Sequence, residues 1–137
     1  MRSVGMTSPI NSLLRAMTST LLANATVLGM VGRDGIKDRR LLFSAEPYVM
    51  VGDMESKDLS TDGDGLLECF VTLQVWSSTS RREVETLADL LRDLLHDAAL
   101  TLDGATLVSI LHVKTVSRRE AKTALYLAEV QFRAVLG

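Results

Sequence analysis

Residues 66–76 read LLECFVTLQVW, with apolar side chains at every second position. These apolar positions are Leu67, Cys69, Val71, Leu73 and Val75. Glu68, Thr72 and Gln74 occupy positions between them. A period of two is typical of a β-strand that turns one face toward a core. We therefore predict a strand over residues 66–76.

The residues that follow this strand predict an amphipathic helix. Residues 80–83 read SRRE and fit a capping box, in which Ser80 accepts the Glu83 N–H and the Glu83 carboxylate reaches back to the Ser80 N–H. Behind this box, apolar residues recur at spacings of three and four: Val84, Leu87, Ala88, Leu91, Leu94 and Leu95. This spacing places them on one side of a helix. We expect the helix to end near His96.

The remaining segments complete an α+β pattern. Ser8 and Pro9 suit the N-cap and first position of a helix that ends near residue 22 or 23, and Asn24 suits the cap of a short turn over 25–31. Residues 48–51, which Gly52 bends, and residues 106–116 and 124–136 favour strands. We predict one domain over 1–137, with residues 1–7 as an N-terminal tail. Its fold class is α+β, a largely antiparallel four-stranded sheet with two amphipathic helices packed on one face.

The other face of this sheet also carries apolar side chains: Phe70, Trp76, Leu125 and Leu127. An apolar patch left open on a monomer invites association. We therefore expect another copy of the chain to cover this face, and Trp76 to become buried only on assembly.

The tetrapeptide SRRE occurs twice, at residues 80–83 and 117–120. Chance and local turn chemistry explain the repeat. Its arginines, Arg81, Arg82, Arg118 and Arg119, are nevertheless candidate interface residues, because guanidinium groups suit bidentate pairing between subunits.

Composition disfavours several classes of protein. Fifteen Lys and Arg against seventeen Asp and Glu give the wrong sign of charge for a dedicated nucleic-acid binder. The single cysteine cannot form an internal disulfide. No apolar run reaches the roughly 18 residues of a membrane span, and residues 1–7 lack the apolar core of a signal peptide. These features predict a soluble cytoplasmic protein without a membrane partner.

No reactive site emerges from the motifs. Asp58, Asp62 and Asp64 lie in an acidic, Gly-rich segment, but an EF-hand that starts at Asp58 would place Cys69 where the bidentate glutamate belongs. We expect residues 56–65 to form a mobile acidic loop, and Cys69 to be a core side chain. His96 suits a contact with the helix dipole, and His112 a surface or partner-facing position. We predict no catalytic residue, cofactor or metal site.

Several short motifs nevertheless resemble those of a known family. PYVMVG at 47–52, TDGDG at 61–65, VTLQVWS at 71–77 and LHDA at 95–98 follow one another as in the tail completion family of long-tailed bacteriophages. That family includes tail terminators of phages and of phage-derived gene transfer agents. The resemblance spans about residues 9–136, and residues 35–46 do not take part in it.

The resemblance implies a structural role and no enzyme activity. The family's tail terminators form a ring, usually of six subunits, that caps the head-proximal end of the tail tube, stops its polymerisation and joins the tail to the head connector. The implied partners are further copies of the chain, the tail tube protein and a connector or stopper protein, with DNA only as passing cargo. The implied location is the host cytoplasm during assembly and then the phage-like particle. Asp58, Asp62 and Asp64 would face the tube or the lumen.

Other classes stay open at this point. They are a small α+β ligand-binding domain, another neck or minor tail protein, and an enzyme with an unrecognised site. The oligomeric state separates them best, because a ring protein should assemble whereas a ligand-binding domain should be a monomer or dimer.

Overall fold

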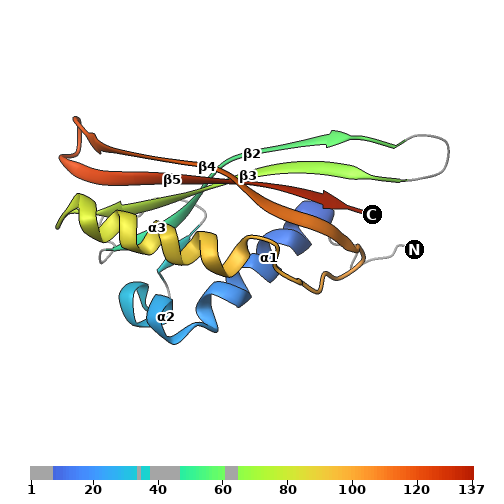
Figure 1. Ribbon diagram of the computed structural model, residues 1–137, viewed down its shortest axis with the longest axis horizontal. Helices are drawn as coiled ribbons and strands as arrows, with labels where there is room; N and C mark the ends of the chain where they lie inside the picture. Colours follow the sequence, from blue (N-terminus) through green and yellow to red (C-terminus); the bar gives the residue numbers. More distant parts are fainter. Residues whose placement is uncertain (1–7, 34, 38–46, 61–64) are drawn as a thin grey trace.

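The computed structural model describes residues 8–33, 35–37, 47–60 and 65–137. The elements are, in chain order, α1 (Pro9–Leu22), α2 (Ala25–Val31), β1 (Ile36–Lys37), β2 (Tyr48–Asp58), β3 (Leu67–Ser77), α3 (Arg81–Leu95), β4 (Leu107–Glu120) and β5 (Leu125–Leu136). The strands form one sheet in the order β1-β2-β3-β5-β4, and the helices lie under one face of it (Figure 1). The predicted α+β class is confirmed.

The sheet is built from two long hairpins. β2 pairs antiparallel with β3, β3 with β5, and β5 with β4, while the two residues of β1 pair parallel with the start of β2. The alternation predicted for β3 is confirmed, since Cys69, Val71, Leu73 and Val75 are all buried on the helix side.

Two strands are longer than the sequence predicts. β2 passes Gly52 through a bulge and runs to Asp58, so the first three residues of the predicted loop 56–65 belong to a strand. β4 runs to Glu120, so the second SRRE segment lies in a strand and not in a turn. The reason is pairing, because Asp58 lies opposite Leu67 and Glu120 opposite Leu125. A strand ladder of this kind overrides weak local β-propensity.

The helix caps follow the sequence closely. Ser8 Oγ accepts the Asn11 N–H at 3.1 Å, and Asn24 Oδ1 accepts the Val27 N–H at 3.0 Å. Ser80 Oγ accepts the Glu83 N–H at 3.1 Å, as the capping box requires.

The other half of the predicted capping box, in which the Glu83 carboxylate binds the Ser80 N–H, is replaced by a different contact. The carboxylate of Glu83 accepts a hydrogen bond from the hydroxyl of Ser77, the last residue of β3. The Ser77 hydroxyl in turn accepts the Thr79 N–H at 3.0 Å. The Glu83 side chain therefore links the start of α3 to the end of β3.

The two histidines fasten the other end of α3 to the sheet. His96 Nδ1 accepts the backbone N–H of His112 at 2.9 Å, and Nε2 of His112 lies 2.7 Å from Thr115 Oγ1. The His112 ring meets Phe132 edge to face, with centroids 5.9 Å apart. Burial, followed by the positive charge of nearby Arg92, lowers the pKa of His112. His112 is half-buried, so its predicted surface position holds in part. The dipole contact predicted for His96 stays a prediction.

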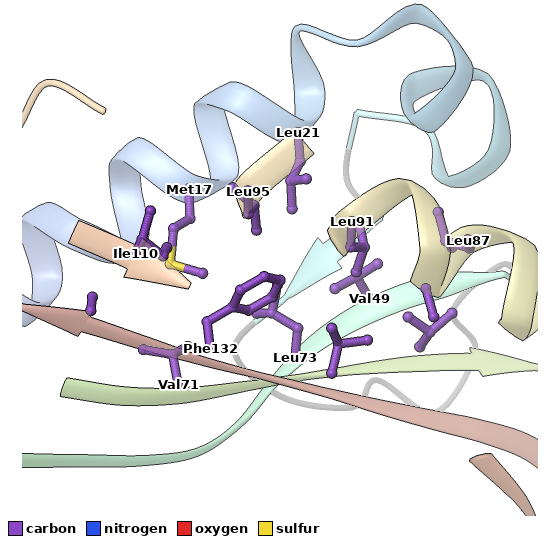
Figure 2. Close-up of a cluster of buried hydrophobic side chains, with 14 of the residues drawn as sticks. Met17, Leu21, Val49, Val71, Leu73, Leu87, Leu91, Leu95, Ile110 and Phe132 are labelled. Carbon is purple, nitrogen blue, oxygen red and sulfur yellow. The ribbon is translucent and has the colours of Figure 1, made fainter. Parts of the chain in front are cut away.

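The core fills the space between the sheet and the helices (Figure 2). The helices contribute Leu13, Met17, Leu21, Leu87, Leu91 and Leu95. The sheet contributes Val49, Val71, Leu73, Ile110, Val130 and Phe132. Cys69 is fully buried, as predicted, and its burial raises the pKa of the thiol.

Phe132 lies at the centre of this core and is 1% exposed. Phe132→Ala should lower the free energy of unfolding by about 3–5 kcal/mol, because it removes a ring and leaves a cavity that close-packed neighbours fill only in part. Val108→Ala, at a position 60% exposed, is the control and should change it by less than about 0.5 kcal/mol. Urea unfolding of both variants measures this, and equal losses would contradict the assignment of the core.

Candidate functional site

The sheet face turned away from the helices is the candidate site, here called the second face. One end of it is an apolar cluster formed by Tyr48, Trp76, Leu125 and Leu127, against which Met50 packs. Trp76 is only 8% exposed in the single chain. The prediction that Trp76 becomes buried only on assembly is therefore wrong. The cause is register, since Tyr48 on β2 and Leu127 on β5 lie directly opposite Trp76 on either side of it.

A chain of hydrogen bonds leads from this cluster across the middle of the second face. The indole N–H of Trp76 donates to Gln74 Oε1 at 3.3 Å, and Gln74 Nε2 donates to Glu129 Oε2 at 3.2 Å. Arg118 Nη1 donates to Glu129 Oε1 at 2.8 Å. The Arg118 hydrogen bond lowers the pKa of Glu129, and the same contact raises the pKa of Arg118.

These hydrogen bonds connect two side chains that the sequence analysis selected for separate reasons, Trp76 and Arg118. The residues between them, Gln74 and Glu129, were not predicted. Both face away from the core in the alternating patterns of their strands, which is a signal available from sequence. Their pairing required the β3–β5 register, which places Gln74 directly opposite Glu129.

Phe70 lies further along the second face and is half-buried. It lines a hollow of about 300 Å³ together with Asp53, Met54, Glu55, Thr72 and Gln131. A neighbouring hollow of about 230 Å³ is lined by Asp53, Thr72, Lys114, Val116, Glu129 and Gln131. These volumes lie at or below the lower limit of small-molecule sites, which are also mostly apolar. The hollows therefore give little support to a ligand-binding role.

The two arginine pairs gather at one end of the molecule. Arg81 and Arg82 begin α3 and are exposed, and Arg119 near the end of β4 is also exposed. In the sheet register Ser77, which precedes α3, lies opposite Tyr126, and Tyr126 lies opposite Arg119. Figure 1 accordingly shows the start of α3 and the β4–β5 turn at the same end.

The end of β2, with Asp58, lies at the opposite end of the molecule (Figure 1). Asp58 Oδ1 accepts the Ser60 N–H at 2.7 Å, and hydrogen bonding to Ser60 lowers the pKa of Asp58. The Asp58 carboxylate therefore stabilises the backbone conformation that follows the end of β2. Asp62 and Asp64, the other two predicted residues, lie outside the described residues.

Neither metal chemistry nor membrane insertion finds support in the part of the chain that the structure describes. Over residues 8–33, 35–37, 47–60 and 65–137, no group of three His, Cys, Asp or Glu side chains is placed to hold a metal ion. No helix in these ranges is long and apolar enough to span a membrane.

Comparison with known proteins identifies the family. The geometry defines a small α+β domain whose second face is apolar at one end and polar in the middle. The family model described as "Tail completion protein gp17" matches residues 15–137, and the chain belongs to this family. Family membership makes it a structural protein of phage tails. The matched range includes residues 35–46, which the sequence motifs had left unassigned.

A solved structure supports the same fold. A chain from the "Virion of native gene transfer agent (GTA) particle" aligns with a TM-score of 0.85 at 22% identity, over 96% of this chain and 98% of that one. No curated protein matches the sequence. The family resemblance read from the short motifs is confirmed.

The Arg118–Glu129 pair should make stability depend on pH. Folding lowers the pKa of Glu129 below its usual 4.5, so the stabilisation is present above that value and fades as pH falls through the folded pKa. Glu129→Gln should cost about 0.5–1 kcal/mol at pH 7, a modest amount because Arg118 is half-exposed. Urea unfolding from pH 7 downward should show wild type and variant converging. A Glu129→Gln difference independent of pH would contradict the pairing.

Trp76 should stabilise the single subunit. Trp76→Ala should lower the free energy of unfolding by about 3–5 kcal/mol, because the indole is packed within its own chain. Phe70→Ala, at a half-buried position, should cost less. Urea unfolding at protein concentrations where the chain is monomeric measures both. A Trp76→Ala variant that is as stable as wild type but unable to assemble would instead support the prediction that Trp76 acts in assembly.

Proposed function

We propose that this chain is a tail terminator. A ring of six copies closes the head-proximal end of the tail tube, stops its polymerisation and offers the surface to which a head connector or stopper protein joins. The observation that carries this proposal is the family match over residues 15–137. The similar chain from a gene transfer agent virion supports a place in a phage-like particle, reached after assembly in the host cytoplasm.

The ends of the subunit suit contacts along a tail axis. A terminator must bind the tube on one side and the connector on the other, so its two ends need different surfaces. Arg81, Arg82 and Arg119 form a basic end, and in the described residues none of them makes a salt bridge. Arginine that is exposed and without a charged partner suits bidentate contacts with carboxylates of another protein. The opposite, acidic end carries Asp58 next to the hairpin tip.

DNA passes through such a ring as cargo and is not held by it. The formal charge of -2 offers no general attraction to phosphate. Asp58, with Asp62 and Asp64 of the same segment, would add repulsion if that segment faces the lumen. The chain's lasting partners in this proposal are other copies of itself, the tube protein and the connector.

Loss of the gene in producing cells tests the proposal. Electron microscopy should show headless tails of uncontrolled length, because nothing then ends the tube or joins it to the head. Supplying the wild-type chain should restore both length control and heads. Arg81→Glu/Arg82→Glu should fold but fail to restore attachment to heads or tube. Arg15→Glu/Arg33→Glu, the same charge change in the helical layer, should restore it.

Tails of normal length with heads attached in the absence of the gene would overturn the proposal. Headless tails of normal length would instead indicate another neck protein of the same family.

A further inference from the structure

We propose that the two edge strands of the sheet are complementary docking surfaces, so that β2 of one copy of this chain joins β4 of the next. This inference rests on the proposed ring and names the surfaces that build it. The acidic edge is defined here as residues 53–58 of β2, and the basic edge as β4, Leu107–Glu120.

Among the described residues, both strands have an open edge. β1 pairs only with Val49 and Met50, so over the described residues nothing pairs with the outer side of β2 beyond Met50. β4 ends the sheet on the opposite side. The outer backbone groups of an edge strand are a ready template for another strand.

Exposed apolar side chains are concentrated on the same two strands. Among the described residues the exposed large hydrophobic side chains are Met54, Val108, Leu111, Val113 and Val116. Met54 belongs to the acidic edge and the other four to the basic edge. Four of the five lie on β4 alone and so form a cluster and not scattered single residues. The apolar residues therefore favour a surface that a protein covers.

The bulges of β4 help to present this surface. The register with β5 skips Val108 and Val113, which are the extra residues of two bulges. They are 60% and 46% exposed. A bulged residue leaves its own ladder and is turned toward a different neighbour.

The charges of the two edges are opposite in sign. The acidic edge has three carboxylates, Asp53, Glu55 and Asp58, against one lysine. The basic edge has three cations, Lys114, Arg118 and Arg119, against one glutamate. In the described residues Asp53, Glu55, Lys114 and Arg119 make no salt bridge. Lys114 lies near Glu129 and helps to lower its pKa, whereas Asp53, Glu55 and Arg119 are available to a partner.

This charge pattern selects how two copies meet. Opposite charges across paired strands stabilise the pair, whereas like charges oppose it. Two acidic edges or two basic edges therefore repel each other, and an acidic edge attracts a basic one. Each copy has one of each kind, so the contact is head to tail and repeats from copy to copy. Contacts of this type generate a closed ring when the rotation between copies closes.

Charge reversal of one edge at a time tests the inference. Asp53→Lys/Glu55→Lys gives a chain with two basic edges, and Lys114→Glu/Arg119→Glu gives a chain with two acidic edges. All four residues are exposed, so both variants should fold as wild type by circular dichroism. By native mass spectrometry at low ionic strength, wild type should form rings. Each variant alone should associate at least tenfold more weakly.

A mixture of the two variants provides the decisive measurement. In an equimolar mixture every contact again joins an acidic edge to a basic one, provided that the two chains alternate. Oligomers should therefore return, with even numbers of subunits and equal amounts of each chain. A single chain that carries all four substitutions should also assemble alone. Asp89→Lys/Asp93→Lys on α3 adds the same charge as the first variant but away from both edges, and it should assemble as wild type.

The outcomes separate this inference from the proposed function. Oligomers of wild type that persist unchanged in both variants, or a mixture that stays dissociated, would overturn the edge contact and leave the ring intact. A wild-type chain that stays monomeric under these conditions would also overturn the edge contact, even if it restored tails in cells. Normal tails without the gene would overturn the function whatever the edges do.

Discussion

The central place of β3 in the sheet is the constraint on which the rest of the structure depends. β3 lies between β2 and β5 and pairs with both along its length. On one face its alternating apolar residues hold α1 and α3 against the sheet. On the other face Trp76 is enclosed by its neighbours on the adjacent strands. The serine that ends this strand also binds the first turn of α3, so one strand sets both layers of the fold.

Local signals in the sequence predicted most of this fold. The period of two in β3 and the period of three and four in α3 depend only on neighbouring residues, as do the caps at Ser8, Asn24 and Ser80. What the sequence left out depends on distant partners. β1 consists of two residues that become a strand only beside Val49 and Met50. The ends of β2 and β4 are extended by their partner strands in the same way.

The candidate site was less predictable for the same reason. Sequence patterning assigned Trp76 to the second face correctly, but its burial depends on Tyr48, which is 28 positions away in the chain and adjacent in the sheet. Gln74 and Glu129 gain their significance only from the register that aligns them. Arg81 and Arg119 share one end because β5 brings β4 alongside β3. The short motifs identified the family because their order along the chain is itself a sequence property.

The bulges of β4 have a consequence for the chain before it meets a partner. A long, regular edge with exposed valines would invite unlimited strand stacking, the route by which proteins form fibres. The extra residues at Val108 and Val113 interrupt the hydrogen-bonding repeat twice within fourteen residues, so only a strand whose own register matches these interruptions can pair along the whole edge. The strand thus exposes apolar side chains to water along an edge that a regular extended peptide does not match.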